Sequence, residues 1–177
     1  MQNPSGDNWD QHWTDLAGPS SINPGQRYRR MLVVRTLQLE EAGAPVRLLD
    51  IGSGLGDLAR DVMALYPRIE FVGLDQSRAG VEISARKVPS ARFLQKDLLS
   101  GSDDAGRLAC WATHAVCAEV LEHLDHPEQL LEQAQTYMAP GCKLVVTVPG
   151  GPMSEFDRHI GHRRHFGAPG LRELLVK

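Results

Sequence analysis

The chain has 177 residues, of which 42% are hydrophobic and 23% are charged, a balance that fits one globular domain and excludes a disordered chain. The formal net charge is −3 with neutral histidines, so no overall positive field attracts nucleic acid. No apolar run approaches the roughly 18 residues of a membrane span, and no signal segment precedes the first element. Three cysteines without a CxxC pair argue against a disulfide framework. We therefore expect a cytoplasmic protein that does not contact membranes.

Polar residues, Gly and Pro dominate residues 1–24, which we expect to form an arm with a short amphipathic piece around Trp9 and Trp13. A single domain is expected from residue 25 to residue 177, beginning with a helix of about 16 residues. Strands are expected at 46–51, 69–74, 91–95, 112–118 and 142–148. Helices are expected at 57–66, 77–87 and 128–138, with a further helix from Pro169 and loops at 99–110 and 149–166.

This alternation predicts an α/β fold, a doubly wound Rossmann-like parallel sheet with helices on both faces. Five strands are visible in the pattern. Ligands bind such sheets at the carboxyl ends of the strands, near the point where the strand order reverses. The residues that directly follow each predicted strand are therefore the first candidates for a functional site.

The segment after the first predicted strand carries alternating glycines at positions 52, 54 and 56, and the second strand ends in Asp75. An acid at that place can accept hydrogen bonds from both ribose hydroxyls of a nucleotide. The third glycine position of a dinucleotide fingerprint is occupied by Asp57, whose carboxylate would repel a pyrophosphate at the helix N-terminus. A cationic ligand without phosphate avoids this repulsion, and Asp50 and Asp57 would suit its positive charge. A P-loop is excluded, because no Gly-Lys-Ser/Thr follows the glycines.

Together with four later segments, this loop resembles class I S-adenosylmethionine (SAM)-dependent methyltransferases. The resemblance covers roughly residues 46–176 and depends on motifs that occur in the order of the family. These are Asp-x-Gly-x-Gly-x-Gly from Asp50, the acid at 75, Gln-Lys-Asp-Leu at 95–98, Glu-Val-Leu-Glu-His-Leu at 119–124 and Ala-Pro-Gly-Cys-Lys-Leu-Val-Val-Thr-Val-Pro at 139–149.

The resemblance implies a transferase with SAM as cofactor and S-adenosylhomocysteine (SAH) as product. It assigns the methionine part of SAM to the glycine loop, the ribose to Asp75, and the adenine to Asp97 and Leu98. Glu119 is expected near the methionine end. Arg29 and Tyr28 are candidates for the methionine carboxylate, although a helix surface is the simpler interpretation. The expected cofactor site comprises Asp50, Gly52, Ser53, Gly54, Gly56, Asp75, Gln76, Asp97, Leu98 and Glu119.

Methyl transfer requires alignment and often a base for the acceptor. Histidine is the side chain best suited to accept a proton near neutral pH, and the segments after the fourth and fifth strands are rich in it. His162 and His159 are the leading candidates for the base, and His123 is the third. Gly-His-x-Arg-x-aromatic at 161–166 also resembles the corresponding loop of small-molecule methyltransferases. Arg163 and Arg164 are alternatives for binding an acidic acceptor.

A second resemblance concerns Glu119, Glu122, His123 and His162, which match the metal ligands of small-RNA 3′-terminal 2′-O-methyltransferases. On a helix the first three would share a face, and mixed oxygen and nitrogen ligands would suit manganese. The same Glu-Val-Leu-Glu-His segment is widespread in methyltransferases without metal, and the charge of −3 does not fit the basic surface of the RNA enzymes. We therefore expect no metal and no nucleic-acid partner.

Class I members usually add a sixth strand and an antiparallel seventh strand, and this chain ends at Lys177 inside the helix that should precede them. The domain is thus expected to be incomplete at its C-terminus, with the fifth strand as an open edge. Truncation, a homodimer through this edge and a natural five-stranded variant remain alternatives.

Three functions follow as hypotheses from these observations. The first is methyl transfer to an oxygen or nitrogen of a small-molecule acceptor. The second is metal-dependent RNA 2′-O-methylation, and the third is a non-catalytic module that binds SAM or a partner protein. The sequence does not identify the acceptor.

Overall fold

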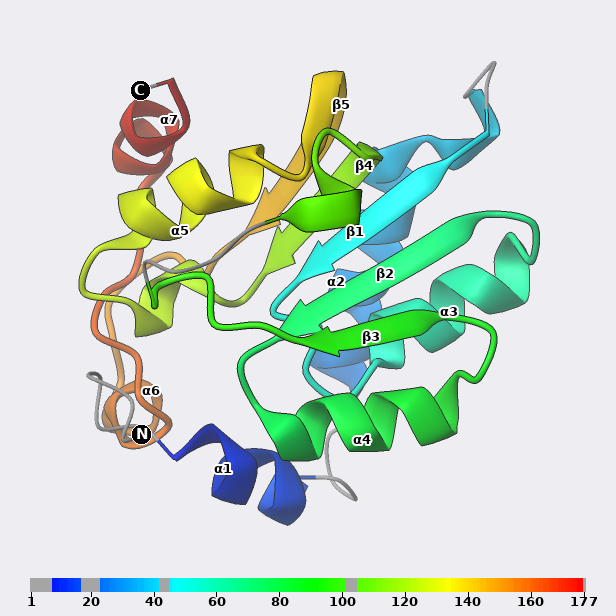
Figure 1. The fold of residues 1–177 in the computed structure, drawn as a ribbon. Helices are drawn as coiled ribbons and strands as arrows, with labels where there is room; N and C mark the ends of the chain where they lie inside the picture. The colour runs from blue at the N-terminus through cyan, green and yellow to red at the C-terminus, as the bar shows by residue number, and fades with distance from the viewer. Residues whose placement is uncertain (1–7, 17–22, 42–44, 101–104, 177) are drawn as a thin grey trace.

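A computed structural model describes residues 8–16, 23–41, 45–100 and 105–176. The described residues do not include the other parts of the expected arm, residues 101–104 of the expected loop or Lys177. Five parallel strands form one sheet in the order β3-β2-β1-β4-β5 (Figure 1). The strands are β1 (Arg47–Ile51), β2 (Glu70–Asp75), β3 (Arg92–Gln95), β4 (Ala112–Ala118) and β5 (Met138–Thr147).

Helices separate the strands and cover both faces of the sheet, which confirms the predicted Rossmann-like α/β class (Figure 1). They are α1 (Trp9–Leu16), α2 (Pro24–Leu37), α3 (Asp57–Leu65), α4 (Arg78–Lys87), α5 (Pro127–Gln135), α6 (Glu155–His159) and α7 (Ala168–Val176). Short 3₁₀ turns occur at Leu39–Glu41, Gly106–Leu108 and Leu121–His123. Within the described part of the chain, no helix is long and apolar enough to cross a membrane.

The hydrophobic core has two layers because successive strand residues point to opposite faces of a sheet. On β1, Leu48 joins the layer that contains Val33 of α2 and Val62 of α3. Its neighbour Leu49 joins the other layer, which contains Leu130 of α5. Buried apolar residues on both faces are typical of parallel strands, and they hold the carboxyl ends of β1, β2 and β4 in fixed positions.

The fifth strand begins at Met138, earlier than the predicted residue 142, and α5 ends correspondingly at Gln135. The register jumps from Ala112 opposite Met138 to His114 opposite Lys143. Pro140 falls in this irregular part, where the ladder does not need its missing N–H. The prediction was wrong here because an apolar pattern does not reveal a bulge.

Two short helices bring distant parts of the chain to the carboxyl ends of the strands. Helix α6 lies in the segment predicted as a loop, and a capping box between Ser154 and Asp157 begins it. Helix α1 packs beside α4 (Figure 1). Oδ1 of Asp10 on α1 accepts hydrogen bonds from Ser77 Oγ at 2.6 Å and from the Ala79 N–H at 3.1 Å. The N-terminal segment is thereby attached to the start of α4.

Candidate functional site

A pocket of about 890 Å³ opens at the carboxyl ends of the strands. Its walls come from the segments that follow β1, β2, β3 and β4, and from α1, α2 and α6. All ten predicted cofactor residues except Gly56 line it, as do the three predicted candidates for the base. The structure thus brings together side chains that the sequence places more than a hundred residues apart.

The glycine loop after β1 turns through left-handed backbone conformations, with φ of 75° at Gly52, 50° at Gly54 and 70° at Gly56. The N–H groups of Gly52 and Ser53 donate to the Leu74 carbonyl at 2.8 and 3.0 Å, which ties the loop to β2. A Cβ atom on Gly52 would overlap Val120 Cγ2. Glycine is needed here both for its backbone freedom and for its lack of a side chain.

Asp75 is held by two backbone donors at the floor of the pocket. Its Oδ2 accepts from the Gly54 N–H at 2.7 Å and its Oδ1 from the Ser77 N–H at 2.8 Å. Burial raises the pKa of this carboxyl, and the two hydrogen bonds oppose the rise. Each carboxylate oxygen keeps further acceptor capacity for the hydroxyl groups of a ligand.

The two other acids of the first motif have different surroundings. Burial, and next the charge of Asp75, raises the pKa of Asp50 to about 7. A cation in the pocket would favour the ionised form of this carboxyl. Asp57 instead accepts from Arg60 Nη1 at 2.9 Å and Lys87 Nζ at 3.0 Å. The expectation that both acids would serve a cationic ligand is therefore supported by the surroundings of Asp50 alone.

The remaining cofactor candidates form the side of the pocket next to β3. Leu98 is buried, and Asp97 Oδ1 accepts from the Leu99 N–H at 3.0 Å, which fixes its turn. The Gln76 carbonyl accepts from Gln95 Nε2 at 3.2 Å. An apolar side chain beside an oriented carboxylate is suited to a planar heterocycle with an exocyclic amino group.

Helix α1 supplies a wall that sequence reasoning assigned only to an arm. A Cβ atom on Gly54 would lie 2.9 Å from Trp13 Cη2, and one on Gly80 would lie 3.0 Å from Trp13 Cδ1. Trp9 packs edge-on against His123, with ring centroids 4.8 Å apart. In the sequence, the four-residue spacing of the two tryptophans indicated that they share one face of a helix. It could not show that one contacts the glycine loop and the other a histidine.

Glu119 follows β4 in a left-handed conformation with φ of 56°. It pairs with Arg29 Nη2 at 3.2 Å and accepts from Thr147 Oγ1 at 3.1 Å. Arg29 therefore faces the pocket, whereas Tyr28 is 59% exposed and does not line it. Burial is the main cause that raises the pKa of Glu119, and Arg29 opposes it.

Glu122, His123 and His162, which we call the Glu122 cluster, each offer a ligand atom within 4.8 Å of the others. Glu119 is outside this group, so the face that Glu119, Glu122 and His123 would share on a helix does not form. The reason is local, because residues 121–123 form a 3₁₀ turn after a left-handed residue rather than an α-helix. His159 lies apart from the cluster, on exposed α6 at the rim of the pocket.

Burial controls the protonation of the Glu122 cluster. It raises the pKa of Glu122 to about 8, with a further contribution from the charge of Glu119. It lowers the pKa of His123 to about 4, helped by the charge of His162. Burial also lowers the pKa of His162. Both imidazoles are neutral near pH 7 and keep a lone pair.

Comparison with known proteins agrees with this geometry. A family model described as a methyltransferase domain matches residues 25–175. The chain belongs to this family. The predicted resemblance to class I SAM-dependent methyltransferases is confirmed, and the matched region begins at the second residue of α2 and ends within α7.

Among curated relatives, trans-aconitate 2-methyltransferase from Methylobacterium nodulans is 31% identical over 133 residues, which cover 75% of this chain and 49% of the relative. The chain spans about half the length of this relative and less than two thirds of the next two. Among solved structures, the plantazolicin methyltransferase BpumL with SAH has a TM-score of 0.68 at 18% identity, covering 94% of this chain and 72% of that one. The cyclase SpnF has a TM-score of 0.69 at 22% identity, covering 88% and 58%. Both show the fold.

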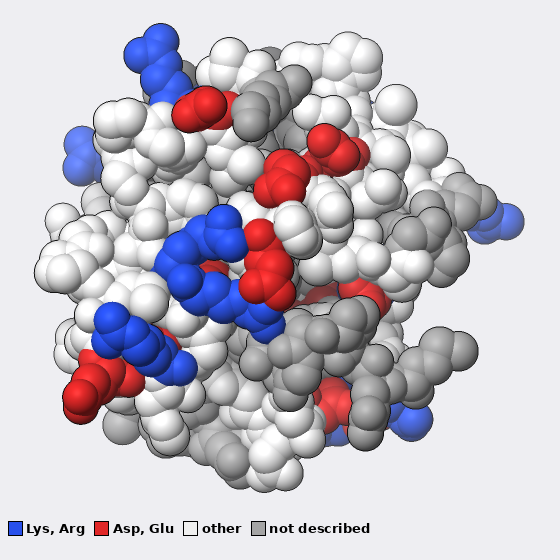
Figure 2. Space-filling model, turned by 90° about the vertical axis from the view of Figure 1, so that its left-hand side faces the viewer, with Lys and Arg blue, Asp and Glu red and all other residues white. Residues whose placement is uncertain are grey.

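The two arginines considered for an acidic acceptor have partners in this methyltransferase domain. Arg163 pairs with the Asp125 carboxylate, and Arg164 Nη2 donates to the Asp125 carbonyl at 2.8 Å. These contacts attach the loop after β5 to the loop after β4. The face of the molecule shown in Figure 2 carries basic and acidic groups next to one another, an arrangement that does not produce a strong field of one sign.

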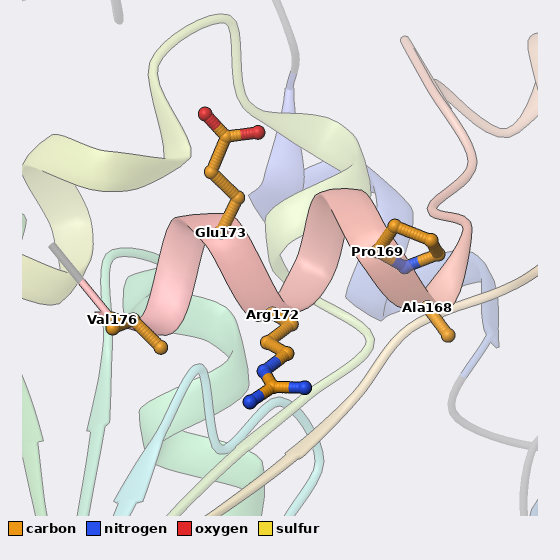
Figure 3. Close-up of a pocket in the computed structure, with 5 residues that line it drawn as sticks. All are labelled: Ala168, Pro169, Arg172, Glu173 and Val176. Carbon is orange, nitrogen blue, oxygen red and sulfur yellow. The ribbon is translucent and has the colours of Figure 1, made fainter.

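A second hollow lies along α7 of the methyltransferase domain (Figure 3). It is lined by Ala168, Pro169, Arg172, Glu173 and Val176. These residues all come from one helix, and none follows a strand of the sheet. The hollow therefore lacks the strand-end groups that characterise the site in this fold.

Proposed function

We propose that the protein is a SAM-dependent methyltransferase that transfers a methyl group to an oxygen or nitrogen of a small-molecule acceptor. The observation that carries the proposal is the position of Asp75. This acid lies at the floor of the strand-end pocket, fixed by the Gly54 and Ser77 N–H groups, in a chain of the methyltransferase family.

The chemistry of the pocket supports SAM as the cofactor. Asp75 would accept hydrogen bonds from the two ribose hydroxyls, and Leu98 with Asp97 would bind the adenine. The methionine part would follow the glycine loop, where Asp50 and Glu119 favour its positive charge. Trp13 would close the pocket over the loop.

In the proposed reaction a lone pair of the acceptor attacks the methyl carbon of SAM. The carbon–sulfur bond breaks, its electron pair stays on sulfur, and SAH leaves as a neutral thioether. The acceptor's proton passes to a base. We assign this role first to His159, because it is the most exposed of the three candidates, with His162 and His123 as alternatives deeper in the wall.

A small-molecule acceptor is supported by the relatives, of which several are named as trans-aconitate 2-methyltransferases and one as a demethylmenaquinone methyltransferase. The mixed charge of the face in Figure 2 favours this class over a nucleic-acid backbone. The likeness to a cyclase shows that the same fold serves other chemistry, so methyl transfer must be measured directly.

The test is transfer of labelled methyl groups from SAM to a panel of carboxylates, phenols, catechols and amines. We expect a labelled product that requires the chain and disappears with Asp75→Ala. His159→Gln should lower turnover by about 10²-fold or more while leaving SAM affinity unchanged. Tight SAM binding without transfer to any acceptor class would contradict the proposal and favour the binding-module hypothesis.

A further inference from the structure

Glu122 is a buried carboxylate without the donors that such a group needs. It is 0% exposed, and neither of its oxygens has a hydrogen-bond partner among the residues that the structure describes. The nearest ring nitrogen of the cluster is His162 Nε2, at 4.0 Å from Oε1. A buried carboxyl in this state requires a proton or a cation.

The hydrogen bonds of His162 determine which of its nitrogens carries the hydrogen. His165 Nδ1 lies 3.1 Å from the Gly151 carbonyl, which can only accept, so this nitrogen carries a hydrogen. In neutral His165 the Nε2 atom is then an acceptor, and it lies 3.1 Å from His162 Nδ1. With both rings neutral, His162 Nδ1 donates and its Nε2 keeps a lone pair. That lone pair is on the nitrogen nearest to Glu122.

His123 also keeps a lone pair on the nitrogen that faces the cluster, but through a different hydrogen bond. Its ring forms a hydrogen bond with the backbone of Gly161, while its Nδ1 is buried and has no partner among the described residues. A carbonyl at Gly161 takes the Nε2 hydrogen and leaves the lone pair on Nδ1. The edge-on ring of Trp9 excludes water from one side of this imidazole.

We propose that Glu122, His123 and His162 bind one divalent transition-metal ion, of the Zn²⁺ or Co²⁺ class, in the wall of the pocket. One possible ligand atom of each side chain lies within 4.8 Å of the other two, and the Glu122 oxygens and His123 Nδ1 have no hydrogen-bond partner from another described residue. Two imidazoles with one carboxylate are a ligand set of catalytic zinc sites, which keep a further position open. Both histidines give their other nitrogen to a fixed partner, as metal-binding histidines usually do.

The backbone around the cluster is preorganised for such an ion. The Arg163 N–H donates to the Glu122 carbonyl at 2.8 Å, which sets His162 opposite Glu122. A rival set, Asp157 with His162 and His165, is also close enough. In that set Asp157 Oδ2 already accepts from the Ser154 N–H and Oγ, both at 2.7 Å, and His162 Nδ1 and His165 Nε2 already bond to each other at 3.1 Å. The Glu122 cluster is therefore the better site.

An ion here would face the pocket that also holds His159. It would bind an oxygen of the acceptor and lower the pKa of a hydroxyl group, leaving His159 as the base. This role rests on the proposed function, whereas the binding itself does not.

The test is a titration of Co²⁺ into the chain, freed of any polyhistidine tag and pretreated with chelator, followed by visible absorption and calorimetry. We expect one equivalent to bind with absorption bands of low-symmetry cobalt. Glu122→Gln and His162→Gln should each weaken binding by about 100-fold or more. His126→Gln is the matched control, because its side chain is 66% exposed and outside the cluster, and it should bind like wild type.

Absence of bands and heat in the wild-type chain would overturn the metal site, and so would equal affinity in Glu122→Gln. Glu122→Gln mimics the protonated acid, so a wild-type chain that binds no cobalt together with a stable Glu122→Gln variant would show that Glu122 holds a proton instead. If Glu122→Gln does not fold, His162→Gln decides the question, with circular dichroism as the folding control. SAH calorimetry in chelator tests the cofactor site separately, so loss of one function is distinguished from loss of the other.

Discussion

Two parts of the pocket satisfy their buried acids in opposite ways. We call the part after β1 and β2, which would hold the cofactor, the cofactor side, and the part after β4, which would hold the acceptor, the acceptor side. On the cofactor side, Asp75 accepts hydrogen bonds from two backbone N–H groups, those of Gly54 in the glycine loop and of Ser77 just after β2. On the acceptor side, neither oxygen of Glu122 has a side-chain or backbone partner from another described residue. Asp75 keeps acceptor capacity for the hydroxyl groups of a ligand, whereas Glu122 requires a proton or a cation. Both carboxyl groups are buried, but only Asp75 receives hydrogen bonds from the backbone N–H groups of other described residues.

The largest expected effect concerns the pH dependence of stability through Asp50. Its pKa is raised to about 7 in the folded chain, whereas an unfolded aspartate titrates near about 3.9. The folded state holds this proton more tightly, so the stabilisation is fully present below about pH 4 and is lost as the pH rises through 7. The free energy of unfolding should fall by about 1.4 kcal/mol per pH unit over that window.

Urea denaturation between pH 4 and 8 measures this slope in the wild type and in Asp50→Asn. The variant keeps the shape of the side chain without the titration, so its slope should be smaller by the contribution of Asp50. The titration of Glu122 remains in both chains and cancels in the comparison, whereas the difference in slope includes the coupling between Asp50 and Asp75. Identical pH slopes in the two chains would mean that burial does not raise the pKa of Asp50.

A smaller effect is expected at the glycine loop. Gly52→Ala places a side chain at φ of 75° and against Val120 Cγ2, and it should lower the free energy of unfolding by about 2–3 kcal/mol. Adding Val120→Ala should recover the steric part, roughly 1 kcal/mol. Gly141→Ala is the matched control, because φ is 79° and no atom lies within 4 Å of the new Cβ. An equal loss in Gly52→Ala and Gly141→Ala would show that the contact with Val120 has no cost.

The smallest effect separates the two sides through one helix. Trp13 contacts the glycine loop and Trp9 contacts His123, although both belong to α1. Trp13→Ala should weaken SAH binding by about tenfold, because a large apolar contact over the loop is lost. Trp9→Ala should change SAH affinity by less than about threefold. Calorimetry with SAH on both variants checks this. Equal losses of SAH affinity would mean that the two tryptophans affect the pocket only through the stability of α1.

The cofactor side could be predicted from the sequence because its parts are local. The glycine loop and Asp75 follow directly from strands, and Ser77, whose side chain accepts from the Gly80 N–H, caps the start of α4. The structure confirms these places in the fold. The acceptor side depends on contacts between distant loops. A helical spacing suggested that Glu119 joins Glu122, but the left-handed turn at Glu119 directs its side chain to Arg29.

Two other features were beyond a local pattern. Helix α6 has a readable signal, Ser154 with Asp157 three residues later, but this five-residue helix was too short to show periodicity. The attachment of α1 through Asp10 to Ser77 joins residues far apart in the sequence. Only tertiary packing determines that such an arm becomes a wall of the pocket.

The central claim is that the strand-end pocket binds SAM through Asp75. Calorimetric titration of SAH into the wild-type chain, Asp75→Ala and Asp75→Asn tests it most directly. We predict micromolar binding by the wild type and a loss of about 30-fold or more in the alanine variant, because two charge-assisted hydrogen bonds to the ribose disappear. No binding by a chain shown to be folded, or equal affinity in all three chains, would contradict the account.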